Sequence, residues 1–208
     1  MTSLAVYCAD IGSVAQGRFG WAGGLAGLSP GLRSGTSIAD LADEVAQLLR
    51  AGVPVALGFE CPQFVPITTE PRQLTAARPG EGARPWSAGA GAGALATGLT
   101  ETVWVLGRVR EQIPAGIPAH LDWGRFVAAE GAGLFVWEAF VTGAAKTLTH
   151  IGDAEVAVER FLASLPTPDA VNAITCERVH SLIGAALLRT GWSTDLQVLS
   201  TPCLVVKA

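Results

Sequence analysis

Four acidic residues stand where a folded chain could gather them. Asp10, Glu60 and Glu138 each come at or near the end of an apolar run, and Asp169 follows Pro168 at the predicted start of a helix. Ligands of open α/β sheets bind beyond the carboxyl ends of the strands, so these side chains are expected to meet. Clustered carboxylates repel one another, and their hard oxygen atoms favour Mg²⁺ or Mn²⁺. Two such ions about 3.5 to 4 Å apart would stabilise the attacking and leaving oxygens of phosphodiester hydrolysis.

Each acid also has a structural interpretation. Asp10 could end a strand in a glycine-containing turn, and Asp169 could favour the helix dipole by about 0.3 to 1 kcal/mol. Glu60 and Glu138 interrupt strongly apolar runs, where an ionised carboxylate rarely lies unpaired. We therefore prefer the joint metal site, in which all four acids are both catalytic residues and metal ligands.

A second group of residues could bind the substrate. Arg84 lies beside Trp86, so a guanidinium could hold a phosphate while the indole stacks on a base. Ser87 and the glycines after it would offer backbone N–H groups at a helix start, and Arg18 and Arg78 could add further positive charge. Alternatively, the Trp86 indole could pack against the protein, and the arginines could be solvated charges in a loop.

Other catalytic constellations are disfavoured. His120 and His150 have no close His or Cys at metal-ligand spacing, and His180 has only Cys176 nearby, with no second pair of ligands close in the chain. The chain contains no G-x-S-x-G motif, and nothing near Cys8 supplies a base for a thiol. Serine and cysteine hydrolase chemistry is therefore not expected.

The apolar patterning predicts strands alternating with helices, typical of an α/β domain. We expect one domain over 1–208, with a long irregular Pro/Gly-rich segment at about 61–97. The predicted strands are 4–11, 18–22, 53–60 and 134–140, with edge strands at 196–199 and 203–206, and the predicted helices are 38–50, 99–112, 120–129, 153–165 and 168–191.

Composition limits the partners. The 208 residues are 50% hydrophobic and only 15% charged, with a net charge of −4. This sign opposes non-specific binding to nucleic acid, although a nucleic acid or nucleotide substrate stays open. The beginning of the chain does not resemble a secretory signal and no membrane span is apparent, which favours the cytoplasm. The four scattered cysteines indicate neither a zinc ribbon nor disulfides, and a homodimer could cover apolar surface.

The ordered set of motifs resembles an RNase H-like family of uncharacterised, predicted nucleases. The similarity spans most of the chain, and the motifs that carry it are Asp10-Ile11-Gly12, Gly17 to Ala22, Gly58 to Pro62, Arg84 to Ser87, Val136 to Phe140 and Pro168 to Ala173. The resemblance implies a mixed five-stranded sheet, in which an antiparallel hairpin joins parallel strands. It also implies that the acids of the family's centre fall on Asp10, Glu60, Glu138 and Asp169.

Two functions follow as hypotheses. The first is a metal-dependent nuclease or phosphodiesterase that uses the carboxylate cluster and Mg²⁺ or Mn²⁺. The second is a catalytically degenerate RNase H-like module that binds a nucleotide-like ligand or a protein partner. A sugar-kinase-like phosphotransferase is a weaker third, because the chain looks too short for its two-domain cleft.

Overall fold

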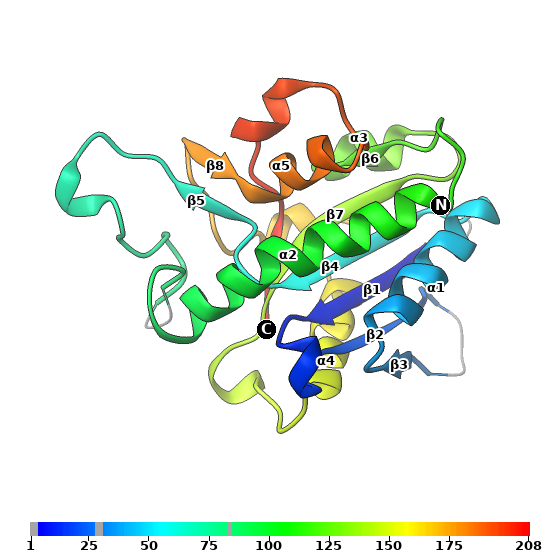
Figure 1. The fold of residues 1–208 in the computed structure, drawn as a ribbon, viewed down its shortest axis with the longest axis horizontal. Coiled ribbons are helices and arrows are strands. Elements are labelled where there is room, and N and C mark those ends of the chain that lie inside the picture. The colour runs from blue at the N-terminus through cyan, green and yellow to red at the C-terminus, as the bar shows by residue number, and fades with distance from the viewer. Residues whose placement is uncertain (1–3, 28–30, 83–84) are drawn as a thin grey trace.

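The structure is a computed structural model that describes residues 4–27, 31–82 and 85–208. It is an α/β fold in which helices flank a mixed sheet, as Figure 1 shows. The α/β class and the mixture of parallel and antiparallel strands are therefore confirmed. The sheet has seven strands in the described residues, so the expectation of five was wrong.

The sheet follows the order β3-β2-β1-β4-β7-β6, and β9 pairs with β7. β2 runs antiparallel to β1 and β3, whereas β4, β6, β7 and β9 form parallel pairs. The strands are β1 (Ala5–Asp10), β2 (Gly20–Leu25), β3 (Arg33–Gly35), β4 (Val55–Glu60), β6 (Ala119–His120), β7 (Leu134–Phe140) and β9 (Val205–Lys207). A separate two-stranded sheet pairs β5 (Phe64–Pro66) with β8 (Val179–Ser181).

The three central strands β1, β4 and β7 are apolar apart from one acid each, because helices cover both faces of the sheet. In β1, Tyr7 belongs to the core on one face, whereas Val6 and Cys8 belong to the core on the other. This alternation is the two-residue period of a strand. It decides which carboxylates leave the sheet on the same side.

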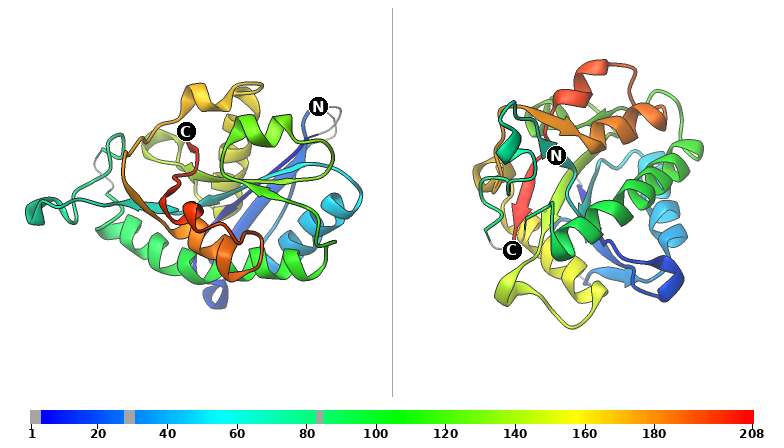
Figure 2. Two further views of the ribbon diagram at one scale, coloured as in Figure 1. Left: turned by 90° about the horizontal axis from the view of Figure 1, so that it is seen from above. Right: turned by 60° about the vertical axis from the view of Figure 1, so that its left-hand side comes forward.

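The helices form the two outer layers (Figure 2). The helices are α1 (Ile38–Arg50), α2 (Gly89–Glu111), α3 (Trp123–Ala128), α4 (His150–Ala163) and α5 (Leu182–Arg189). α1, α2 and α5 contribute to the core on the face of Tyr7, and α3 and α4 to the core on the face of Val6.

Two predicted elements agree closely with the structure. β7 spans Leu134–Phe140, and α1 starts directly after Ser37, whose hydroxyl accepts a hydrogen bond from the Asp40 N–H at 3.1 Å. α1 buries its apolar stripe, including Leu41 and Val45, against the sheet.

The long helix expected over 168–191 was wrong. Pro168–Val171 makes a short 3₁₀ turn. The chain after it is not helical, because its polar groups form hydrogen bonds with residues far away in the sequence. The Asn172 side chain accepts a hydrogen bond from the Val205 N–H at 3.0 Å, and β8 pairs with β5. Within this stretch, α5 is the part that is α-helical. The predicted strand at 196–199 was also wrong, since Leu196–Ser200 is a 3₁₀ helix.

The segment at 61–97 is less irregular than expected. It contains β5 and a 3₁₀ turn at Pro71–Gln73, and α2 already begins at Gly89, ten residues before the predicted start at 99. The alternating Gly and Ala residues favoured a loop by their glycine content, but the helix continues through them. Alanine is the strongest helix former and offsets part of the cost of glycine.

All four cysteines are free, as expected. No helix in the described ranges is long and apolar enough to cross a membrane.

Candidate functional site

Asp10 and Glu60 lie side by side at one edge of the sheet. They end the neighbouring parallel strands β1 and β4 and are direct partners in the register. Because they share a register position, both side chains leave the same face of the sheet. Asp10 is 3% exposed and the Glu60 side chain is 10% exposed. The structure therefore brings together two of the four acids predicted from the sequence.

The third acid of the cluster is Asp153, which the sequence analysis missed. It lies in the first turn of α4, and one oxygen from each of Asp10, Glu60 and Asp153 lies within 4.8 Å of the others. An acid in the first turn of a helix has a sufficient structural reason in the helix dipole. Nothing local to Asp153 therefore indicated that it faces the strand ends.

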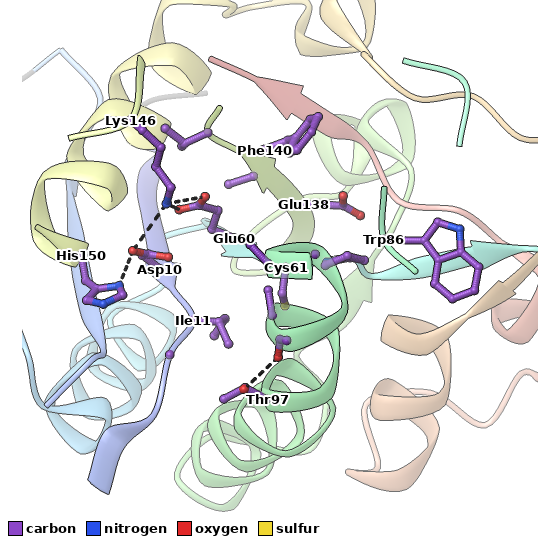
Figure 3. A pocket seen from close by; sticks show the side chains of 18 of the residues that line it. Asp10, Ile11, Glu60, Cys61, Trp86, Thr97, Glu138, Phe140, Lys146 and His150 are labelled. Atoms are coloured by element: carbon purple, nitrogen blue, oxygen red, sulfur yellow. Dashed lines mark hydrogen bonds and ion pairs between the residues drawn. The ribbon is translucent and has the colours of Figure 1, made fainter. Parts of the chain in front are cut away.

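Lys146 lies among these carboxylates (Figure 3). Its ammonium is 2.9 Å from Glu60 Oε1, 2.5 Å from Asp153 Oδ2 and 4.0 Å from Asp10 Oδ2. The Lys146 side chain is 30% exposed, so the cluster is open to solvent on this side. Asp153 also accepts a hydrogen bond from the Thr147 N–H at 2.6 Å, which fixes its second oxygen.

His150 completes the cluster from the start of α4. Its Nδ1 lies 2.5 Å from Asp10 Oδ2, and the imidazole is 39% exposed. Thr149 caps the helix by accepting a hydrogen bond from the Gly152 N–H at 3.0 Å, which sets the direction in which His150 leaves the helix. The Nδ1 contact leaves Nε2 for proton exchange.

Burial changes the protonation of both strand-end carboxyls. Burial raises the pKa of Asp10 to about 6, although Glu60 and Lys146 counteract it. Burial and the negative charge of Asp10 raise the pKa of Glu60 to about 9, against the opposing effect of Lys146. One ammonium therefore does not compensate the cluster, and the site favours additional positive charge.

Glu138 has a different environment from Asp10 and Glu60. Its register partner is Phe59, whose ring lies in the core on the face of the sheet opposite to Asp10 and Glu60. Glu138 therefore also leaves the sheet on that opposite face. Arg78 binds both of its oxygens, with Nη2 2.6 Å from Oε1 and Nη1 2.9 Å from Oε2. Both side chains are 1% exposed. Glu138 is thus held in a closed ion pair.

Asp169 lies apart from the other predicted ligands. It is an exposed residue of the 3₁₀ turn Pro168–Val171, and it does not line the cavity described below. Burial and the charge of Asp122 raise its pKa. The structure thus does not assemble the expected set of four acids.

The predicted substrate-binding residues also differ in their positions. Arg18 is exposed and lines the cavity, as does Trp86. The Trp86 indole N–H donates to Ala76 O at 2.9 Å, and the Ser87 hydroxyl donates to Thr75 O at 2.6 Å, so both anchor their own segment. Arg84 lies outside the described residues.

A cavity of about 390 Å³ opens beside the carboxylate cluster. Figure 3 shows Lys146, His150, Asp10 and Glu60 together on one side of it and Trp86 far from them on the other. Ile11, Pro62, Ala94, Phe140 and Val141 supply apolar lining. The cavity therefore combines this apolar lining with two charged groups, the open carboxylate cluster and the mutually paired Glu138, Arg78 and Glu81.

The donor set of Asp10, Glu60 and Asp153 fits a divalent cation. All three provide hard oxygen atoms, and burial, which is the main cause of the raised pKa values of Asp10 and Glu60, disfavours their ionised forms unless a cation is close. Comparisons with protein-family models, with curated proteins and with solved structures gave no match for this chain.

Proposed function

We propose that this protein is a divalent-metal-dependent phosphoester hydrolase with an RNase H-like architecture. The order β3-β2-β1-β4-β7, in which an antiparallel hairpin joins parallel strands, supports this architecture. Asp10, Glu60 and Asp153 would hold the cation. The further expectation of Mg²⁺ or Mn²⁺ as the cation follows from the hard oxygen donors.

One observation carries the proposal. Two carboxylates in register at the ends of parallel strands meet a third from α4. Among the described residues, the basic groups within 4.0 Å of these three acids are the half-buried ammonium of Lys146 and the imidazole of His150. A structural ion pair would need one acid for one base. An excess of buried acids at a cavity is instead typical of a site that is completed by a ligand.

The residues around the cluster have roles that suit phosphoester hydrolysis. A bound divalent cation would supply Lewis-acid polarisation of a phosphoryl oxygen. His150, oriented through Nδ1 by Asp10, can take up or deliver a proton at Nε2. Arg18 can attract the anionic substrate from its exposed position on the cavity rim.

The proposed donor set is smaller than the one predicted from the sequence. Glu138 is neutralised by Arg78, and Asp169 lies outside the cavity, so neither is included. With three carboxylates in place of the expected four, the cluster has fewer ligands than a pair of cations needs. The proposal therefore concerns a single cation site.

A second candidate function is favoured by Lys146. Its ammonium already contacts Glu60 and Asp153 in the way that a bound cation would. If this arrangement persists in solution, the cluster is a closed structural unit. The protein would then be a degenerate RNase H-like module that binds a nucleotide-like ligand or a protein partner.

Calorimetric titration with Mn²⁺ tests the first function against the second. We expect stoichiometric Mn²⁺ binding that raises the melting temperature, because a ligand of the folded state stabilises it. Asp10→Asn and Asp153→Asn should abolish binding, while Asp169→Asn, an exposed acid outside the cavity, should leave it unchanged. Absence of Mn²⁺ binding by the wild-type protein would reject the metal site and support the module.

The catalytic part needs its own measurement. The Mn²⁺-loaded protein should release p-nitrophenol from bis(p-nitrophenyl) phosphate, and Asp10→Asn and Asp153→Asn should reduce the rate to background. Mn²⁺ binding without any turnover of this ester or of the phosphoesters named in the next section would contradict hydrolysis.

A further inference from the structure

The cavity beside the cluster has the size of a small-molecule site. Its volume of about 390 Å³ falls in the range of about 300 to 1,000 Å³ that is usual for small ligands. The wall includes the first turns of α2, the end of β7 and residues of the 62–86 segment. A ligand that reaches the carboxylates would therefore be enclosed by three parts of the chain.

The part of the cavity wall formed by Arg78 and Glu81 is firmly attached to the sheet. Arg78 contacts Glu138 of β7 and also Glu81, whose Oε1 lies 2.7 Å from Arg78 Nε. Glu81 in turn accepts a hydrogen bond from the Trp86 N–H at 3.1 Å. Because the Arg78 and Glu81 side chains are 1% exposed, breaking these contacts would leave buried charges unpaired. Widening the cavity at this wall would therefore require the unfavourable separation of buried charges.

Gly93 differs from two neighbouring glycines of α2 in the space around it. A Cβ at Gly91 would come within 2.3 Å of Pro85 O, and one at Gly98 within 2.4 Å of Cys61 Sγ, so packing requires both. Gly93 is exposed, and a Cβ there would meet no atom of the described residues within 4 Å. Glycine inside a helix costs about 1 kcal/mol relative to alanine. Gly93 lines the cavity, so its missing side chain keeps space that a ligand can fill.

The two ends of the cavity differ in chemistry. The cluster end carries Lys146, with exposed Arg18 elsewhere on the cavity wall. The remaining wall includes Ala94, Phe140 and Trp86, which offer apolar and aromatic surface. It also includes Arg78, Glu81 and Glu138, whose charges are paired with one another. A ligand with an anionic head and an apolar or planar body matches this distribution. The net charge of −4 opposes a polyanion, which would extend past the cavity.

We propose that the substrate is a small phosphoester whose phosphate lies at the carboxylate cluster and whose organic group packs on the Gly93 wall of α2. This inference rests on the proposed hydrolase function and names its substrate class. In the reaction, the oxygen of water forms a bond to phosphorus, and the bond from phosphorus to the ester oxygen breaks. The departing ester oxygen takes up a proton, so an alcohol or phenol and a phosphate are released.

Gly93→Leu tests the cavity directly. The site has room for the new side chain, and leucine favours helix, so the variant is expected to fold. Ala96→Leu is the matched control, because Ala96 is an exposed residue of the same helix that does not line the cavity. With Mn²⁺ present, Gly93→Leu should raise the KM for phenyl phosphate esters about tenfold or more, whereas Ala96→Leu should not. Both variants should bind Mn²⁺ as the wild type does.

The substrates compared are bis(p-nitrophenyl) phosphate, p-nitrophenyl phosphate, a nucleoside 5′-monophosphate, and single-stranded DNA and RNA oligonucleotides. We expect higher kcat/KM for one of the small esters than for either oligonucleotide. Faster cleavage of an oligonucleotide would overturn the inference and leave the hydrolase function intact. Equal KM values for Gly93→Leu and Ala96→Leu would overturn it as well.

Binding without turnover separates the two proposals. If no substrate is hydrolysed, calorimetry with phenyl phosphate, with and without Mn²⁺, still tests the cavity. Binding that Gly93→Leu weakens and Ala96→Leu does not would support the ligand class and reject hydrolysis. No binding of phenyl phosphate under either condition would reject the ligand class.

Discussion

Asp10 and Glu60 are direct register partners on the parallel strands β1 and β4. Their carboxyl groups therefore leave the same face at the same edge of the sheet, and the negative charge of Asp10 raises the pKa of Glu60. Glu138 follows on the next strand, but its register partner is Phe59, so it leaves the opposite face. One residue of register decides which acids can share a cation.

Lys146 is expected to compete with a cation for the carboxylates. Lys146→Met removes the ammonium from Glu60 and Asp153, so Mn²⁺ affinity in calorimetry should rise about tenfold or more. The same variant should lose about 1 to 3 kcal/mol of stability without metal, a value reduced for the exposure of Lys146. Lys207→Met is the control, since Lys207 is the other lysine of the chain and does not line the cavity. Unchanged Mn²⁺ affinity in Lys146→Met would show that the ammonium does not compete.

The stability of the metal-free protein should fall as the pH rises. The pKa of Glu60 is about 9 in the folded state and about 4.3 in an unfolded chain, so the folded state keeps a proton that the unfolded state releases between these values. Glu60 therefore stabilises the fold fully below about pH 4.3, and this contribution is lost as the pH rises to about 9. The slope is at most about 1.4 kcal/mol per pH unit.

Urea unfolding at pH 5, 7 and 9 with a chelator present measures this contribution. Glu60→Gln removes the titrating group and should flatten the decline, while Glu70→Gln, an exposed residue, should keep it. Identical pH profiles for the wild type and Glu60→Gln would contradict the raised pKa.

Arg78 is expected to be a major structural residue. Arg78→Met leaves Glu138 and Glu81 without their buried cation and should cost about 3 to 5 kcal/mol in urea unfolding. The double variant Arg78→Met, Glu138→Met should recover part of this loss, because one unpaired charge is then absent. Arg72→Met, an exposed arginine of the same segment, should change stability by less than about 0.5 kcal/mol. A loss in Arg78→Met no larger than in Arg72→Met would contradict the role of the ion pair.

The sequence analysis predicted the elements whose local pattern matches their environment. α1 has an N-cap and an apolar stripe of helical period, and β7 is an apolar run covered on both faces. The stretch after Pro168 has equally good local helix signals, but pairing of β8 with β5 and of Asn172 with Val205 prevails. Such pairings between residues far apart in the chain cannot be predicted from the local sequence pattern.

The site was predictable only where strand order determines it. Asp10 and Glu60 follow from the rule that parallel strands end at one edge. The exclusion of Glu138 depends on register and on Arg78, which lies 60 residues away in the chain. Asp153 and Lys146 reach the cluster from α4 and the turn before it, and only the packing of α4 on the sheet brings them there.

His150 is expected to transfer a proton in the proposed hydrolysis without binding the cation. Its Nδ1 is held by Asp10, and general acid–base groups contribute about 10²- to 10⁴-fold to rate. His150→Gln should therefore reduce kcat for bis(p-nitrophenyl) phosphate about 100-fold while Mn²⁺ affinity changes little, and it should remove one limb of the pH–rate profile. His180→Gln is the control, since His180 is exposed on β8 and does not line the cavity. A loss of Mn²⁺ affinity as large as the loss of kcat would instead assign His150 to cation binding, because a proton-transfer group acts on the rate and not on the occupancy of the site.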